Sequence, residues 1–344
     1  MTGFVELLAA PFAACVLIAA LHCYMGLHVV KRGVIFVDLA LAQMAALGAV
    51  IALFLGPFLD IHPHEHENAH SLHHETEMLS DPQVAEELFG INIDQEHHQT
   101  HVHKAGEAKH DVAFTYWLKE KLSYILSLLF AFFGAVIFTL GRFRDERVPH
   151  EAIIGIVFVV SSALAVLVLS KAPHGHERME AMLVGSILFV NWNDVLSMLI
   201  LYLPLGILHF TFRRVLTRIS EDIREAESAG IHVRAWDLLF YASFGLMVTQ
   251  SVSIAGVLVV FSYLIIPAAC AIMFVDSLLC SLLFAWGIAL GVSLSGLAFS
   301  AWQDFPTGPS LVVTFGAVLI LCIAIRPFIA QRRSLDLQKT TPHR

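Results

Sequence analysis

Long apolar runs separated by short polar segments dominate the chain, and a helix needs about 20 apolar residues to cross a membrane. The run at 181–212 is too long for one simple crossing. Its NWND break at 191–194 indicates a short half-helix followed by a full one, with the broken backbone covered by protein or a water cavity. The pattern predicts an all-α, polytopic transmembrane helical bundle of eight or nine spans, a single domain over 1–344, with helices near 7–29, 34–58, 118–140, 151–170, 181–212, 235–252, 254–274, 277–299 and 309–329.

Composition agrees with a membrane protein, since 57% of the residues are hydrophobic, only 15% are charged, and the mean hydropathy is +0.72. A soluble domain carries about 25% charged residues. The first apolar run, at 4–30, has no short signal-like core with a cleavage site, so we expect a retained span. The five cysteines lie in apolar stretches without paired spacing, which argues against a disulfide framework.

A polar insert at 60–116 interrupts this pattern. It holds twelve Asp/Glu and two Lys, a balance of −10 in a chain of net charge −8. Imidazole is a common ligand of zinc and other transition metals, so the insert is predicted to associate with metal. A hydrophilic linker of biased composition is the alternative, and we expect much of the insert to be flexible. Its histidines are His62, His64, His66, His70, His73, His74, His97, His98, His101, His103 and His110.

Short loops rich in lysine and arginine face the cytoplasm in most membrane proteins. With nine spans, all such groups of this chain fall on one side, and the insert falls on the other. The predicted location is the bacterial plasma (inner) membrane, with an extracytoplasmic histidine-rich loop and a cytoplasmic C-terminus. The groups comprise Lys31, Arg32, Arg142, Arg144, Arg147, Arg213, Arg214, Arg218, Arg224, Arg234, Arg326, Arg332 and Arg333.

Ionisable side chains inside a membrane are costly and are functional candidates by default. Asp38 lies in an apolar run with Gln43 five residues on, and His22 lies in the preceding run. Asp38 and His22 could meet across two helices and offer an oxygen and nitrogen pair to a divalent ion. Alternatively, Asp38 is stabilised at a helix N-terminus, and His22 is satisfied by a carbonyl. For Glu151, a place in the first turn of a helix favours a capping role.

The Walker A motif of ATP binding is missing from the sequence, which contains no Gly-Lys dipeptide. No catalytic residue is predicted, and the chain is expected not to be an enzyme. The segment 213–236 is polar and amphipathic, with Gly230 closing a helical run, and by itself it indicates an ordinary solvated connector.

Six stretches, taken together in order, resemble the zinc/manganese/iron ABC-transporter permease family, the membrane subunit of metal uptake systems. They cover nearly the whole chain outside the insert. The stretches are VVKRGVIFVDLALAQMAALG, EAIIGIVFVVSSALAVLVLS, LVGSILFVNWNDVL, EAESAGIHVRAWDLL, GVLVVFSYLIIPAACA and DFPTGPSLVV.

The resemblance implies a homodimer with the translocation path at its interface, two cytoplasmic ATPase subunits, and an extracytoplasmic metal-binding protein. It implies that 213–236 is the coupling segment and that Asp38 matches the family's second-span aspartate. The histidine common four residues later is Ala42 here, so His22 or Gln43 is expected to substitute. The implied ATPase-coupling residues are Glu225, Ala226, Ala229, Gly230 and Ile231.

The sequence therefore predicts a permease that imports a divalent transition metal, most readily zinc, with Zn²⁺ (or Mn²⁺/Fe²⁺) as substrate and no permanently bound cofactor. An ATP-independent carrier and a membrane metal sensor are the alternatives. Carriers of that kind usually place paired His/Asp ligands at i, i+4 within spans, and the sequence has none.

Overall fold

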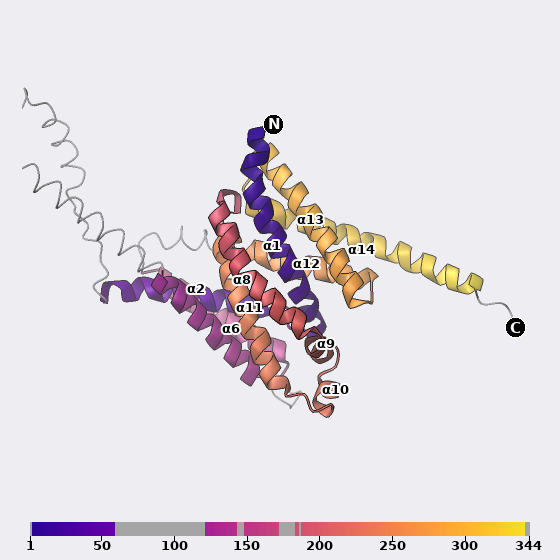
Figure 1. The fold of residues 1–344 in the computed structure, drawn as a ribbon, viewed down its shortest axis with the longest axis horizontal. Coiled ribbons are helices and arrows are strands. Elements are labelled where there is room, and N and C mark those ends of the chain that lie inside the picture. Colours follow the sequence, from indigo (N-terminus) through magenta and orange to yellow (C-terminus); the bar gives the residue numbers. More distant parts are fainter. Residues whose placement is uncertain (1, 59–120, 143–147, 172–182, 186, 341–344) are drawn as a thin grey trace, which may run out of the picture. The chain divides into compact units, whose positions relative to one another are not determined.

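The computed structural model describes residues 2–58, 121–142, 148–171, 183–185 and 187–340, and within these ranges the chain is helical without strands. Figure 1 shows the arrangement. The elements are α1 (Thr2–Arg32), α2 (Val37–Phe58), an unlabelled helix Lys121–Leu140, α6 (His150–Leu169), η1 (Ile187–Phe189), α8 (Trp192–Thr211), α9 (Arg213–Glu221), α10 (Ile223–Ser228), α11 (Val233–Ala255), α12 (Val257–Phe274), α13 (Leu278–Gln303) and α14 (Thr307–Thr340).

Two compact units make up the chain. One comprises 1–48 and 127–344, and the other comprises 49–126. The described part of the second unit is the end of α2 and the start of the helix Lys121–Leu140. The sites below lie in the first unit. The histidine-rich insert lies outside the described residues.

Eight described helices are long and apolar enough to cross a membrane, and a shorter apolar helix covers Val37–Ala52. The predicted all-α bundle of eight or nine spans is confirmed. The long run at 181–212 is indeed broken, because the full helix α8 begins only at Trp192. The Asn191 side chain accepts from the Asn193 and Asp194 amides, and the Asp194 carboxylate accepts from the Asn191 amide. This capping box fixes the helix start; in the region of the expected half-helix, the described residues show helical residues at 183–184 and the short helix η1.

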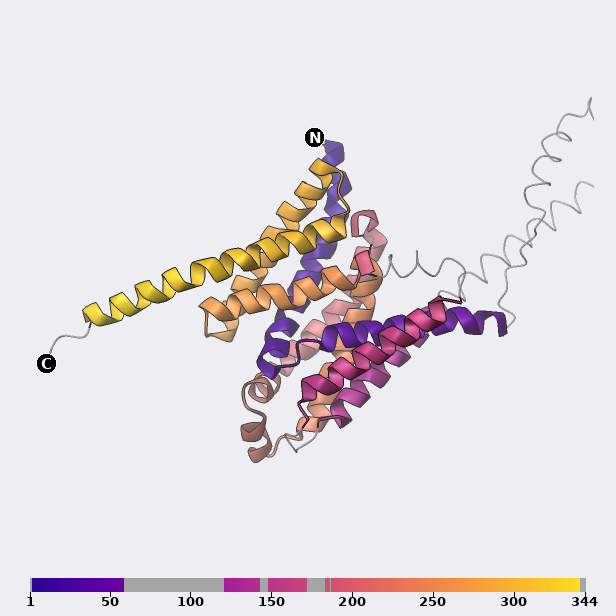
Figure 2. The same cartoon turned by 180° about the vertical axis from the view of Figure 1, so that it is seen from behind.

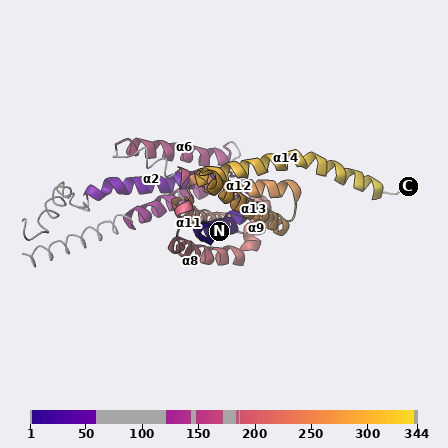
Figure 3. The same cartoon turned by 90° about the horizontal axis from the view of Figure 1, so that it is seen from above.

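Helix α1 lies between α8 on one side and α12 and α13 on the other, as Figure 3 shows. Close approach to α12 depends on Gly26, where an added Cβ would overlap the Leu264 carbonyl. Small residues allow such backbone approach in membranes, where packing replaces the hydrophobic effect. On the other flank, the Trp286 Nε1 of α13 donates to the Ala20 carbonyl at 3.1 Å. Figure 2 shows α14 running beside α12 and α13.

Two glycines with positive φ let backbone pack directly on backbone near the start of α12. Gly185 has φ +66° and Gly256 has φ +80°, and a Cβ on either would overlap the other segment. A Cβ at Gly308 would likewise overlap the Val184 carbonyl. Three of the stretches quoted above therefore meet in one place, at LVGS, GVLVV and PTGPS.

Candidate functional site

Asp38 lies in the first turn of α2, and its side chain is almost completely enclosed, with 1% of the residue exposed. The start of the helix is held from α6, because the Glu151 Oε1 accepts the Phe36 amide at 3.0 Å. Glu151 therefore caps the turn before α2. The dipole of α2 favours a carboxylate at this position. The Asp38 Oδ1 is nevertheless buried without a hydrogen-bond partner among the described residues, which is unusual for a buried polar atom.

His22 of α1 belongs to a buried polar chain with Ser251 of α11 and Tyr202 of α8. Its Nδ1 lies 2.9 Å from the Ile18 carbonyl, which can only accept, so the proton of the neutral ring is on Nδ1. Its Nε2 lies 3.2 Å from the Ser251 Oγ, which also contacts the Tyr202 hydroxyl and lies 2.6 Å from the Met247 carbonyl.

The unprotonated Nε2 of His22 carries a lone pair that faces the Ser251 Oγ at 3.2 Å. Ser251 has one hydroxyl proton, which this Nε2 and the Met247 carbonyl can both accept. A neutral imidazole in this state can coordinate a divalent metal.

Tyr202 lies near both Asp38 and His22. The His22 and Tyr202 rings have centroids 6.2 Å apart, and the Asp38 carboxylate lies within electrostatic range of the Tyr202 hydroxyl. Gln43 is half-buried on the same helix as Asp38, while Ala42 is fully enclosed. Among the described residues, no three His, Cys, Asp or Glu side chains gather closely enough to hold a metal. The candidate ligands among the described residues therefore lie apart and do not form a preformed metal site.

A second buried polar cluster joins the end of α1 and the start of α11 to the connector. The Arg32 Nη1 lies 2.8 Å from the Asp237 Oδ1, and the side chains are 0% and 1% exposed. Arg142 pairs with the other Asp237 oxygen. The Arg32 Nε donates to the Ser220 Oγ at 2.9 Å, and the His28 Nδ1 lies 2.8 Å from the same oxygen. Helices α1, α9 and α11 are therefore connected by charge and hydrogen bonds.

The connector folds into two short helices with a small core of their own. Ala226 is buried with Ile219 and Val233. Helix α10 ends in a Schellman motif, in which Gly230 has φ +80° and the Ile231 amide donates to the Ala226 carbonyl at 3.1 Å. The expectation that Gly230 closes a helical run is confirmed. Glu225, Ala229 and Gly230 are exposed, so this end of α10 lies on the surface of the described chain.

Sequence reasoning missed most of the side chains that surround these candidates. Tyr202 and Ser251 look like ordinary residues of apolar helices, and nothing local indicates that they meet His22. Asp237 had a usable signal, since it is a carboxylate inside a predicted span. His28 and His209 carry the same signal. His209 lies 2.8 Å, by its Nε2, from the Ser243 Oγ.

Comparison with known proteins agrees with this fold. The sequence model of the ABC 3 transport family matches residues 104–326, more than half of the chain. The manganese import system permease protein ScaB of Streptococcus gordonii is 26% identical over 214 residues, which are 60% of this chain and 76% of ScaB. The high-affinity zinc uptake system membrane protein ZnuB of Haemophilus influenzae is 24% identical over 182 residues, which are 50% of this chain and 66% of ZnuB.

A solved structure extends the likeness over the whole fold. PsaBC from Streptococcus pneumoniae, in complex with Fab, superposes with a TM-score of 0.64 at 17% identity, over 98% of this chain and 99% of that one. The chain belongs to the ABC 3 transport family and is a multi-pass membrane permease. The resemblance to metal-uptake ABC permeases is confirmed. The family match begins at residue 104, so the stretch around Asp38 lies outside it.

Proposed function

We propose that this chain is the permease subunit of an ATP-driven importer that carries a divalent transition metal into the cytoplasm, and that zinc is its main cargo. Relatives named for manganese and for zinc support a metal cargo. The eleven histidines of the insert favour zinc, since imidazole suits zinc better than the harder manganese ion.

The unpartnered Asp38 oxygen carries the proposal. A buried carboxylate without a hydrogen-bond donor is costly, and a passing cation would compensate it. The His22 Nε2 lone pair and the Tyr202 hydroxyl lie in the same region, and Gln43 offers a further amide on α2. Because these groups are few and spread along the helices, the ion would be bound weakly enough to leave again. Asp38 is enclosed in this conformation, so metal would reach it only when the helices move.

The exposed end of α10 is the proposed docking surface for a separate ATPase subunit, which hydrolyses the ATP. Glu225, Ala229 and Gly230 would contact it, while Ala226 and Ile231 hold the motif in shape. Movement of α10 would pass through α9 to α1 and α11, because Ser220 and Asp237 are both bonded to Arg32. The functional unit is proposed to be a homodimer with two ATPase subunits and an extracytoplasmic metal-binding protein.

The histidine-rich insert, 60–116, is proposed to be extracytoplasmic and to raise the metal concentration at the outer mouth, or to contact the delivery protein. Capture by many weak sites followed by a tighter intramembrane site allows entry without trapping. This division of roles assigns the cargo preference partly to the insert and the transport step to Asp38 and its neighbours.

Flux measurements distinguish this function from its alternatives. The chain is reconstituted in proteoliposomes with its ATPase, and zinc uptake is followed with and without ATP. We expect uptake that requires ATP and stops when the ATPase carries an inactivating substitution. Zinc uptake that proceeds equally without ATPase would indicate a carrier. Binding of zinc without any flux would indicate a sensor that signals through 213–236.

A further inference from the structure

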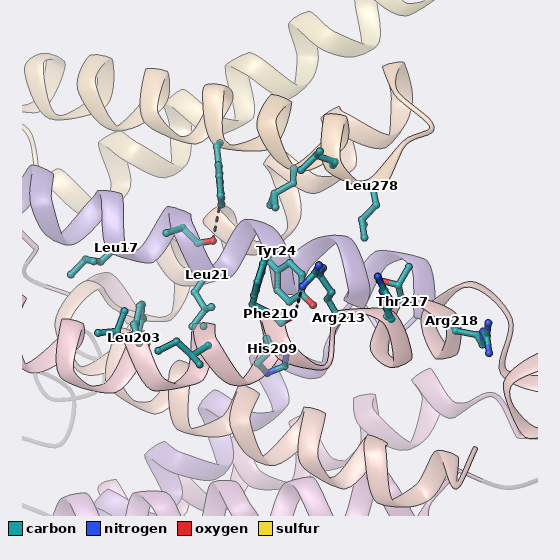
Figure 4. A pocket seen from close by; sticks show the side chains of 18 of the residues that line it. Leu17, Leu21, Tyr24, Leu203, His209, Phe210, Arg213, Thr217, Arg218 and Leu278 are labelled. Carbon is teal, nitrogen blue, oxygen red and sulfur yellow. Dashed lines mark hydrogen bonds between the residues drawn. The ribbon is translucent and has the colours of Figure 1, made fainter. Parts of the chain in front are cut away.

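A long groove runs along the first unit of the chain, between α1, α8, α9 and the start of α13. Its volume is about 1080 Å³, slightly above the common range of about 300–1,000 Å³ for small-molecule pockets. Figure 4 shows its lining from close by. Tyr202 borders both this groove and the proposed metal path, whereas Asp38, His22 and Gln43 do not line the groove.

The chemistry of the groove changes along its length. Leu17, Leu21 and Leu203 line one end, and Arg213, Thr217 and Arg218 lie toward the other, as Figure 4 shows. The change coincides with the end of the α8 span at Thr211 and the start of α9 at Arg213. An apolar trough that ends in arginines at the edge of a span has the polarity of one phospholipid, with its acyl chains inward and its phosphate at the membrane surface.

The arginine end has features that an anion would satisfy. Arg213 and Arg214 occupy the first turn of α9, where the helix dipole disfavours positive side chains and favours an anion. The Arg213 guanidinium is held in place, since it stacks 4.1 Å from the Phe210 ring centroid and donates to the Phe210 carbonyl at 2.9 Å.

Tyr24 provides an independent observation. Its hydroxyl is buried without a hydrogen-bond partner among the described residues, and the side chain lines the groove beside Phe210 and Arg213. Two carboxylates also border this end. Glu221 is paired with Lys31 at 3.1 Å, and Glu225 lies on α10. The balance of Arg213, Arg214, Arg218 and Lys31 over these carboxylates remains positive.

We propose that the groove binds an anionic phospholipid, whose phosphate contacts Arg213, Arg214 and the Tyr24 hydroxyl and whose acyl chains lie against Leu21 and Leu203. A free phosphate ion would use the arginines but would leave the apolar length of the groove uncovered. Bound lipid would brace α9 against α1 and α8, next to the segment that receives the ATPase. The site thus makes the coupling segment sensitive to lipid charge.

Native mass spectrometry of the assembled transporter tests this, with phosphatidylglycerol and phosphatidylcholine of identical acyl chains as probes. We expect retained phosphatidylglycerol to exceed phosphatidylcholine by about tenfold, and the double variant Arg213→Gln/Arg214→Gln to lose this preference. Arg234→Gln, at an exposed arginine that does not line the groove, should keep it. The readout is lipid retention, so it does not depend on transport or on the identity of the metal.

A groove-filling variant tests the acyl-chain end separately. A Cβ at Gly206 meets open space, so Gly206→Leu should fold normally, fill the groove and lower retention of both lipids by about tenfold. The matched control is Gly316→Leu in α14, where a Cβ also meets open space outside the groove.

Three results would overturn the proposal. Equal retention of the two lipids by the unmodified protein would remove the charge preference. Complete displacement of phosphatidylglycerol by millimolar inorganic phosphate would indicate a free-anion site. Disulfide cross-linking of Leu203→Cys between two copies of the chain would show that a second copy, and not lipid, covers the groove.

Discussion

Arg32 of α1 and Asp237 of α11 form an ion pair that is closed off from solvent, with the Arg32 Nη1 2.8 Å from the Asp237 Oδ1. The Asp237 carboxylate also pairs with Arg142, and the Arg32 guanidinium lies 4.0 Å from the Phe240 ring centroid. One aspartate thereby pairs with two arginines near the point where α1, α9 and α11 meet, and these three side chains keep a net charge of +1. The connector and the spans are therefore linked through a cluster of charged side chains.

Asp237→Asn should destabilise the protein strongly, because it leaves Arg32 and Arg142 facing one another without a counter-charge. Loss of one partner from a buried pair typically costs about 3–5 kcal/mol. Thermal unfolding in detergent measures the change. Asp304→Asn is the matched control, since Asp304 is exposed and asparagine tolerates its φ of 54°. Equal unfolding temperatures of the two variants would show that the pair contributes nothing.

Gly26→Ala should weaken the packing of α1 on α12. The added methyl group would meet backbone at the Leu264 carbonyl, which cannot rotate away, so the helices must separate. Overpacking of this kind costs about 1–3 kcal/mol, and the unfolding temperature should fall accordingly. Gly155→Ala in α6 meets open space and should be neutral or slightly stabilising. A Gly26→Ala protein as stable as the original would contradict the close approach.

His22→Gln should shift metal preference toward manganese, because an amide replaces the Nε2 lone pair that suits zinc. The ratio of zinc to manganese uptake should fall several-fold. Ser251→Ala removes the neighbouring hydroxyl but keeps the imidazole, so it should preserve the zinc preference. If His22→Gln lowers stability and leaves the uptake ratio unchanged, His22 serves the fold and is not on the metal path.

Deletion of residues 62–110 should impair uptake at scarce zinc while the maximal rate is largely kept. The insert is proposed to concentrate metal outside the transport step, so saturating zinc should compensate its loss. Since free imidazole protonates near about pH 6.5, the advantage of the intact protein should shrink in mildly acidic medium. A full-length variant with the eleven histidines changed to glutamine distinguishes loss of metal binding from loss of the insert itself. Loss of transport at all zinc concentrations would instead indicate a structural or docking role.

The spans were predictable because the backbone of an apolar run of membrane length must satisfy its hydrogen bonds internally, which favours a helix. The predicted and observed bounds agree within a few residues for most helices, such as 254–274 against Val257–Phe274. Gly230 was predictable for a similar local reason, since a Schellman motif favours glycine. The start of α8 at Trp192 followed from a polar break in the sequence.

The polar pairings were not predictable, because each joins residues far apart in the chain. In the sequence, Arg32 is one of several cations in short polar segments. Only the folded bundle brings it to Asp237, which is 205 positions away. The same holds for His22 and Ser251, 229 positions apart. Periodicity indicates which face of a helix is apolar, but it does not specify which polar residues on different helices meet.

Replacement of Asp38 tests the central claim most directly. Asp38→Asn keeps the shape of the side chain and removes its charge, and Asp38→Ala removes both oxygens. In proteoliposomes with the ATPase, ATP-driven zinc uptake should fall by at least about tenfold in both variants, as expected when a metal-binding group is removed. Asp304→Asn should transport normally. If zinc uptake and metal-stimulated ATP hydrolysis both survive Asp38→Ala unchanged, Asp38 is not on the metal path.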